Sequence, residues 1–538
     1  MGLYGLMALL GGLSALLMSL PWLVPGAGAV ALFSFVPLLL MEQLAFQTKA
    51  RRFWLWQYGV FVLWNTITTF WVGGATVGGA VFAILANALQ MSVVFGIFHF
   101  SRRRLRGVMP YLLLATLWIA WERWYFDTQI SWPWLVLGNA FARTTPLVQW
   151  YEYTGSLGGS LWVWACNLGI YGGLVAFTDN NSRLRSWRIK TAAAVGTVLV
   201  LFAPMVLSLS IYRSYEERSD RGTLDVALLQ PNLDPYEKFG SLTQKQQNDR
   251  LISLASGPLS SRSDSASLLL LAPETFTNDI IVNDLQASRT WRTFDTLLRP
   301  RLGVNLLYGA SSYELFNTRS APSLLARPYG QGWMESHNSA LIQDGSSRTE
   351  IFHKSKLVVG TELMPYPKIF APIDKALGGV IGRCVGQDEI SLLNFRAADG
   401  SEIPLGCAVC YESVYGEYCT GYVRKGAQLL TVITNDAWWG NTPGYRQHLS
   451  YSSLRAIELR RDIARCANTG ISAFINQKGE IVSHTQWWEQ DVLGGRVNLT
   501  DYETAFVRYG DVTGRACTFA AVLLLVAMLL TFIPNRRR

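Results

Sequence analysis

The stretch that decides the fold is Pro404–Glu417, which reads PLGCAVCYESVYGE. A run of small apolar residues leads to Cys410, and the polarity changes at once with Tyr411 and Glu412. This pattern is typical of a buried strand whose last side chain emerges at a turn. A thiol in that place is held by the sheet and open to a cleft, which is what a nucleophile needs.

Two structural explanations of Cys410 compete with the catalytic one. A free cysteine in a strand is most often a buried packing residue. A disulfide with Cys407 is disfavoured, because side chains three residues apart on a strand point to opposite faces. This stretch alone therefore leaves a nucleophile and a packing residue open.

The composition indicates a membrane protein with a soluble insert. Half of the 538 residues are hydrophobic, 20 are Trp and 16% are charged. In a soluble protein the net charge of +9 would suggest nucleic-acid binding, but much of it lies in short clusters between apolar segments. Membrane topology explains such clusters better, so no nucleic-acid partner is expected. The five His and seven Cys lack the spacing of zinc ligands, so we expect neither a metal nor a cofactor.

Eight apolar segments have lengths near the roughly 20 residues that cross a bilayer. Basic clusters at 49–52, 102–106 and 183–190 lie in alternate loops, whereas the intervening loops, such as 73–79, carry almost no Lys or Arg. The positive-inside rule therefore predicts cytoplasmic termini and an external segment from about Tyr215 to Asp511. The predicted transmembrane helices are 3–20, 26–46, 53–72, 78–100, 108–126, 158–178, 191–212 and 516–533.

After Arg221 the pattern changes to strands, turns and helices. Uninterrupted apolar strands indicate a sheet that is covered on both faces, and hence an α/β layered domain. Residues 446–465 have a helical rhythm, and 256–267 are the expected flexible loop. The predicted strands are 224–229, 267–271, 305–310, 339–343, 403–409, 429–434 and 471–476.

Candidate functional residues collect where these strands end, which is where sites form in α/β sheets. Glu274 follows one strand, Cys410 another, and Asn435–Gly440 a third. Taken singly, Glu274 could equally cap a turn, and Lys354 and Lys356 could be solvated surface residues. Only a Glu, a Lys and a Cys taken together make a strong prediction.

These residues resemble the motifs of the carbon–nitrogen hydrolase (nitrilase) superfamily, whose sites use Glu, Lys and Cys in that chain order. Pro273–Thr275 is similar to the glutamate motif, Lys354 to the lysine motif and Cys410–Glu412 to the cysteine motif. Together with its apolar segments, nearly the whole chain resembles the bacterial apolipoprotein N-acyltransferases, which are membrane members of this superfamily. Further similar segments are 226–232, 434–440, 447–448, 455–459 and 468–471.

The resemblance implies a membrane domain of eight transmembrane helices and an extracytoplasmic α-β-β-α sandwich. The implied domains are 1–215 with helices 1–7, 222–508 with the catalytic site, and 514–538 with helix 8 and a basic cytoplasmic tail. It also implies a multi-pass protein of the bacterial inner membrane, with both termini in the cytoplasm and the catalytic domain in the periplasm.

The resemblance further implies the chemistry. Glu274 would be the general base, Cys410 the nucleophile, and Lys354 would stabilise the oxyanion. An acyl chain would pass from a phospholipid, through a Cys410 thioester, to the α-amine of the N-terminal diacylglyceryl-cysteine of an apolipoprotein. Glu362 and Glu412 would be supporting carboxylates.

Other aromatic residues would shape the site. Tyr411 would line the pocket, and Phe239, Trp438 and Trp439 are candidates for contact with lipid, although each is about as readily an ordinary core or interfacial aromatic. The family usually has a Trp in the place of Phe239. It also usually has Leu-Val-Pro-Phe-Gly-Glu where this chain has LVVGTE at Leu357–Glu362.

Two alternative functions stay open. A membrane-tethered, nitrilase-like amidase that hydrolyses a small amide would use the same three residues, but it would not need eight spans. A binding or scaffold protein with an inert Cys410 belongs to another class, and an unreactive thiol would support it.

Overall fold

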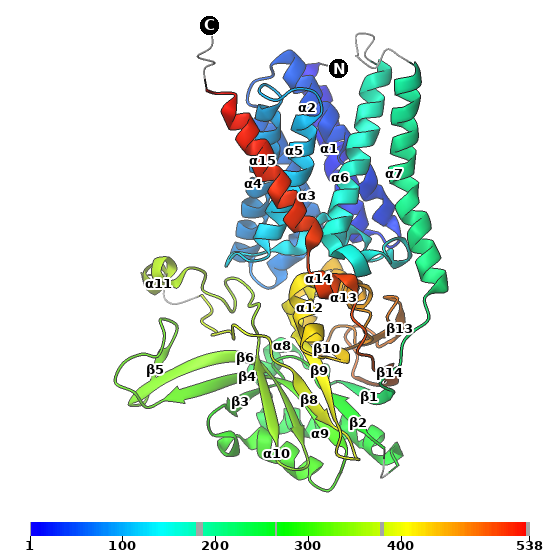
Figure 1. Ribbon diagram of the computed structural model, residues 1–538. Coiled ribbons are helices and arrows are strands. Elements are labelled where there is room, and N and C mark those ends of the chain that lie inside the picture. The colour runs from blue at the N-terminus through cyan, green and yellow to red at the C-terminus, as the bar shows by residue number, and fades with distance from the viewer. Residues whose placement is uncertain (1, 179–186, 264–265, 377–380, 534–538) are drawn as a thin grey trace. The chain divides into compact units, whose positions relative to one another are not determined.

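The computed structural model describes residues 2–178, 187–263, 266–376 and 381–533. The chain forms two compact units (Figure 1). The helical unit consists of Met1–Tyr215 and Tyr509–Arg538, and the sandwich unit is Glu216–Arg508.

The helical unit is built from long apolar helices with many exposed apolar side chains, as expected of surfaces that face lipid. By length and composition, five of the described helical segments can cross a membrane: Leu3–Leu23, Ala27–Thr48, Val77–Ser101, Lys190–Ser214 and Val512–Leu530. The main helices are α1 (Leu3–Leu23), α2 (Val36–Thr48), α3 (Phe53–Thr69), α4 (Val77–Ser101), α5 (Met109–Tyr125), α6 (Tyr151–Thr178), α7 (Trp187–Ser214) and α15 (Val512–Leu530).

The sandwich unit contains two sheets. The first has the order β14-β1-β2-β4-β6-β5, with β3 beside β4 and β7 beside β6; the second has the order β13-β12-β11-β10-β9-β8. The strands of the first sheet are β1 (Thr223–Gln230), β2 (Leu268–Leu271), β3 (Thr277–Ile281), β4 (Val304–Phe316), β5 (Arg327–Tyr329), β6 (Gly332–Asp344), β7 (Thr349–His353) and β14 (Asp491–Asn498). Those of the second are β8 (Leu393–Arg396), β9 (Glu402–Val409), β10 (Leu429–Thr434), β11 (Ile463–Ala467), β12 (Ala473–Ile475) and β13 (Ile481–His484).

The apolar strands make two cores. One core lies between the sheets and contains side chains such as Leu228 and Leu307 from the first sheet and Val409 and Val432 from the second. The other lies between the first sheet and helices α9 (Gln244–Ser261) and α10 (Arg289–Leu298). Helices α12 (Gly416–Arg424) and α13 (Pro443–Leu459) contact the second sheet. The predicted layered α/β fold is confirmed, and two-sided burial explains why the strands are uninterruptedly apolar.

Four predicted elements differ from the structure. The helix expected at 446–465 ends at Leu459, and Ile463 begins β11, because periodicity alone cannot separate a buried strand from a helix. Residues up to Ser261 of the expected loop 256–267 continue α9. Strands β4 and β6 are each 13 residues long and extend beyond the apolar runs at 305–310 and 339–343 that predicted them. Together they leave the sheet as a long ribbon (Figure 1).

Candidate active site

Cys410 stands at the sharp turn that ends β9. It is the first residue of the 3-10 helix η7 (Cys410–Val414), and its φ of 53° lies in the left-handed region. A residue with a side chain adopts this region at a cost of roughly 1–3 kcal/mol, so the surrounding structure must hold it there. Burial raises the pKa of the Cys410 thiol well above its usual value; Glu274 raises it further and Lys354 opposes both. The thiol therefore needs a base before it can attack.

Glu274 follows β2 and both its carboxylate oxygens are hydrogen-bonded. Oε1 accepts from Nζ of Lys354 at 3.1 Å and from Nδ2 of Asn338 at 2.7 Å. Oε2 accepts from the backbone N–H of Asn435 at 3.1 Å. The backbone of Glu274 also passes close to Gly309 of β4, where an added Cβ would lie 2.5 Å from the Cα of Glu274. The carboxylate is thus fixed by three donors and by a close backbone approach.

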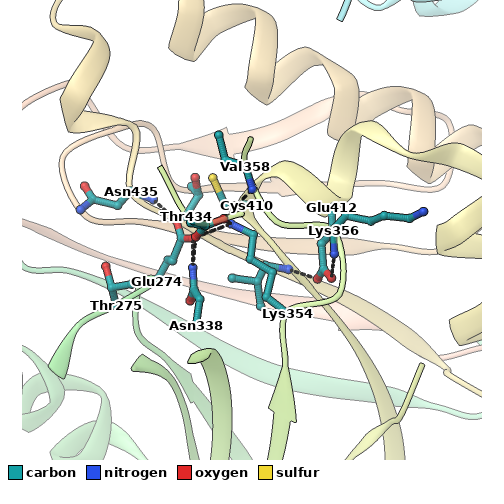
Figure 2. Close-up of polar contacts among 12 residues, drawn as sticks. Glu274, Thr275, Asn338, Lys354, Lys356, Val358, Cys410, Glu412, Thr434 and Asn435 are labelled. Carbon is teal, nitrogen blue, oxygen red and sulfur yellow. Dashed lines mark hydrogen bonds and ion pairs between the residues drawn. The ribbon is translucent and has the colours of Figure 1, made fainter. Parts of the chain in front are cut away.

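Lys354 follows β7 and is 1% exposed. Its Nζ lies 3.1 Å from Glu274 and 3.0 Å from Glu362, so one ammonium is shared by two carboxylates. Figure 2 shows Lys354, Asn338 and Cys410 close to Glu274. Burial alone would lower the pKa of Lys354, but Glu274, Glu362 and then Cys410 hold it well above its usual value. The group is therefore a permanent cation beside the thiol.

Glu362 and Asn338 complete this network. Oε2 of Glu362 accepts from the backbone N–H of Val358 at 2.8 Å, which fixes the loop after Lys354. Nδ2 of Asn338 bridges the two carboxylates, at 2.7 Å from Glu274 and 2.6 Å from Glu362. Sequence reasoning missed Asn338, because nothing in its strand distinguishes it from a solvated polar residue.

Glu412 joins the lysine loop to the cysteine turn. Its carboxylate accepts from the backbone N–H groups of Ser355 at 2.7 Å and Lys356 at 3.2 Å, and from that of Val409 at 2.8 Å. The hydroxyl of Tyr418 adds a fourth donor at 3.0 Å. Burial raises the pKa of Glu412 to about 7, and the three backbone amides oppose that rise. Glu412 is thus a supporting residue of the loops and is not directed at the thiol.

A second buried cluster contacts the backbone of the cysteine turn. The sequence analysis did not predict that its side chains form one group. His448 of α13 contacts the carbonyl oxygen of Cys410, and Asp436, which begins the 3-10 helix η8 (Asp436–Trp439), accepts from both His448 and Arg465 of β11. Burial alone would raise the pKa of Asp436, but Arg465 and His448 hold it far below its usual value. The segments 434–440 and 447–448 matched family motifs, and only the fold brings these side chains together.

The remaining predicted residues lie around this centre. Lys356 points away from the carboxylates, with Nζ 5.2 Å from the ring of Tyr415, so Lys354 alone of the two joins the site. Tyr411 is buried and packs edge-on against Tyr415 at 5.2 Å. Trp438 is 38% exposed, and Trp439 packs edge-on against His448 at 5.5 Å.

Lys238 is a further buried cation near Glu274. Its Nζ donates to Oγ1 of Thr275 at 3.3 Å. Burial lowers the pKa of Lys238 to about 7, and Glu274 opposes this shift. The next residue, Phe239, was predicted to contact lipid, and its side chain lies outside the described residues.

All seven cysteines carry free thiols, including Cys384, Cys419 and Cys466 of the sandwich unit. The site thus combines a buried thiol, a carboxylate held by three donors and a fixed ammonium. A carboxylate can take the thiol proton, and a cation beside the attacked carbonyl can stabilise the oxyanion that forms. The arrangement suits acyl transfer through a thioester.

Two family models match separate parts of the chain. Residues 328–505 match the carbon-nitrogen hydrolase family, and residues 14–169 match the apolipoprotein N-acyltransferase N-terminal domain. Glu274 lies between the two matched segments, so its assignment rests on its contacts.

Two relatives are similar over nearly their whole length. An apolipoprotein N-acyltransferase of Chlorobaculum tepidum is 28% identical over 504 residues, which cover 93% of this chain and 91% of that protein. An apolipoprotein N-acyltransferase of Geobacter metallireducens is 26% identical over 526 residues, which cover 95% of this chain and 93% of that protein. Among solved structures, an amidase from Nesterenkonia sp. covers 52% of this chain and 92% of its own, with 17% identity and a TM-score of 0.34.

Proposed function

We propose that this chain, which belongs to the bacterial apolipoprotein N-acyltransferase family of the carbon–nitrogen hydrolase superfamily, transfers an acyl chain from a phospholipid to an apolipoprotein. The acceptor is the α-amine of the N-terminal diacylglyceryl-cysteine. The observation that carries the proposal is the convergence of Glu274, Lys354 and Cys410 in a chain similar to N-acyltransferases over nearly its full length.

The first half-reaction forms a thioester. Glu274 takes the proton of the Cys410 thiol, and the thiolate attacks the ester carbonyl carbon of the phospholipid. The ammonium of Lys354 stabilises the oxyanion of the tetrahedral intermediate. The C–O bond then breaks, the leaving alkoxide receives the proton from Glu274, and a lysophospholipid departs.

The second half-reaction forms the amide. The lipoprotein α-amine attacks the thioester carbonyl, Lys354 again faces the oxyanion, and Glu274 accepts a proton from the amine. The C–S bond breaks and the proton returns to the sulfur of Cys410, so the enzyme ends as it began. One acyl-enzyme shared by two substrates requires ping-pong kinetics.

A membrane-inserted enzyme has direct access to both lipid substrates, because the phospholipid and the diacylated lipoprotein keep their acyl chains in the bilayer. Five helical segments long and apolar enough to span a bilayer support a membrane protein, and the basic clusters in alternate loops support the orientation. We include in the proposal eight spans, cytoplasmic termini and a periplasmic catalytic domain, with domain bounds 1–215, 222–508 and 514–538. Exposed Trp438 and its neighbour Trp439 are the proposed contacts for the acyl chains.

Intact mass spectrometry of the purified protein after incubation with phospholipid alone tests the proposal. A mass increase of one acyl group that is removed by hydroxylamine and absent in Cys410→Ala is the expected result. A diacylated lipopeptide should then clear the adduct and gain the acyl group. If no adduct appears with any phospholipid while a small amide is hydrolysed, the protein is a membrane-tethered amidase instead.

A further inference from the structure

Three metal-ligand side chains meet on the ribbon formed by β4 and β6. They are Glu314 of β4 and Glu335 and His337 of β6, and one ligand atom from each lies within 4.8 Å of the others. Glu314 pairs directly with Glu335 in the antiparallel register, and residues 335 and 337 share one face of β6 because side chains alternate along a strand. The register of β4 and β6 therefore places the three side chains together.

Among the described residues, the two carboxylates have no Lys or Arg as an ion-pair partner. Carboxylates directly opposite each other on neighbouring strands repel and destabilise the pair. Their one basic neighbour within 4.0 Å in this part of the chain is His337, whose Nε2 lies 4.0 Å from Oε2 of Glu314. Glu335 is only 8% exposed, so water screens this repulsion poorly.

His337 is oriented as a metal ligand is. Its Nδ1–H donates to the carbonyl oxygen of Val385 at 2.7 Å, which fixes the tautomer and leaves the lone pair on Nε2. Nε2 is buried and has no hydrogen-bond partner among the described residues, and the side chain is 5% exposed. A bound cation would accept the lone pair of Nε2 and would also neutralise the two carboxylates beside it.

We propose that Glu314, Glu335 and His337 bind one divalent transition-metal ion, for which Zn²⁺ is the probe. Imidazole with carboxylates suits Zn²⁺ and its neighbours, whereas Mg²⁺ and Ca²⁺ prefer oxygen ligands alone. Ligands at about 2.0–2.2 Å from a tetrahedral Zn²⁺ stand roughly 3.3 Å apart, so donors that lie within 4.8 Å of one another need to close by up to about 1.5 Å. Glu314, whose side chain is 36% exposed, has the freedom to make that movement.

The site goes beyond the proposed acyl transfer and does not depend on it. His337 directly precedes Asn338, whose amide bridges Glu274 and Glu362. A metal that joins β4 to β6 at this position braces the strand that carries Asn338. Its role is structural support of the carboxylates, and it enters no step of the reaction.

The test measures Zn²⁺ binding to full-length, detergent-purified protein in the Cys410→Ala background, after removal of metals with a chelator. Titration calorimetry should give one tight site per chain, and Mg²⁺ at 100-fold excess should not displace Zn²⁺. Bound Co²⁺ should show no thiolate absorption band. Glu335→Gln and His337→Ala should each weaken binding at least 100-fold, whereas the exposed pair Glu489→Gln and His484→Ala should not.

Thermal unfolding provides the second measurement. Zn²⁺ should raise the Tm of the protein and of the control variants but not that of Glu314→Gln, which alters the most exposed ligand and leaves the buried ones in place. Unchanged Zn²⁺ affinity in the three ligand variants, or a thiolate band with Co²⁺, overturns the proposal. Displacement by equimolar Mg²⁺ overturns it too.

Discussion

The ring nitrogen Nε2 of His448 donates to the backbone carbonyl oxygen of Cys410 over 3.0 Å. The other ring nitrogen lies 2.9 Å from Oδ1 of Asp436, and Oδ2 of Asp436 accepts from Arg465 at 2.7 Å. All three side chains are fully buried. They reach Cys410 through its backbone, so they hold the left-handed turn that aims the thiol.

Replacing His448 should therefore slow acylation of Cys410. His448→Ala removes the donor to the Cys410 carbonyl, and displacement of a nucleophile by about 1 Å can cost roughly 100-fold in rate. We expect a 10- to 100-fold lower rate of thioester formation, measured by quenched-flow mass spectrometry, with partial rescue by added imidazole. His484→Ala, on the exposed end of β13, is the control. A normal acylation rate with a lowered Tm would show that His448 only stabilises the fold.

The sequence predicts Glu274 and Cys410 as site residues because each comes after an apolar strand, and side chains beyond strand ends share an edge of the fold. Lys354 follows β7, a strand that the apolar pattern does not predict, so its prediction depends on the family resemblance. Asn338 escapes prediction because it lies within β6, among polar residues. Asp436, His448 and Arg465 lie on three different elements, and only their packing shows that they form one cluster.

The lengths of β4 and β6 were missed for a related reason. Their apolar runs end where the ribbon leaves the core, yet the strands continue with residues such as Glu314 and Glu335. The pairing of those two carboxylates follows from strand register, which the apolar pattern does not fix outside the core. The expectation of no metal depended on the spacing of His and Cys residues along the chain. Strand pairing can bring together ligand residues that are far apart in the sequence, so that spacing does not reveal them.

Lys354 should be needed for both stability and activity. Lys354→Met keeps the aliphatic stem and leaves Glu274 and Glu362 buried without their shared cation. Breaking a buried ion pair from one side costs about 3–5 kcal/mol, and loss of an oxyanion donor, the role proposed for Lys354, costs about 100- to 1,000-fold in rate. The Tm from thermal unfolding and the rate of acylation of Cys410 should both fall. Lys356→Met is the matched control, since Lys356 faces the ring of Tyr415; an equal loss in that variant would contradict the assignment.

Lys238 predicts a pH dependence of stability. Its pKa is lowered by burial from 10.5 to about 7 in the folded protein. Between these values the unfolded chain binds a proton that the folded chain does not, so the free energy of unfolding rises with pH across this window. Below pH 7 Lys238 is charged in both states, and the buried ammonium lowers the free energy of unfolding by its full amount, on the order of 5 kcal/mol.

Lys238→Met should remove this contribution. We expect the variant to be more stable than the parent at pH 7, with the difference shrinking toward pH 10. Tm values from tryptophan fluorescence at several pH values would show it. Lys245→Met is the control, because Lys245 forms an exposed ion pair with Asp249 on α9. A parallel pH profile for the parent and Lys238→Met would contradict the lowered pKa.

Gly309 tests the close backbone approach that places Glu274. Its N–H donates to the carbonyl oxygen of Pro273 at 3.1 Å, and an added Cβ would stand 2.5 Å from the Cα of Glu274 and 2.6 Å from the nitrogen of Thr275. These contacts are with backbone atoms, so no side chain can move aside, and Gly309→Ala must displace the backbone of Glu274. Overpacking of this kind costs about 1–3 kcal/mol.

Because the displaced group is the proposed general base, the acylation rate of Gly309→Ala should fall by at least 100-fold, far more than its Tm suggests. Gly494→Ala in β14 of the same sheet has no atom within 4 Å of the new Cβ and should match the parent in both measurements. Acyl-enzyme formation by intact mass spectrometry, alongside thermal unfolding, separates the two effects. If Gly309→Ala acylates at the parent rate, the position of Glu274 does not depend on this approach, and its hydrogen bonds to Lys354, Asn338 and Asn435 alone suffice to hold it.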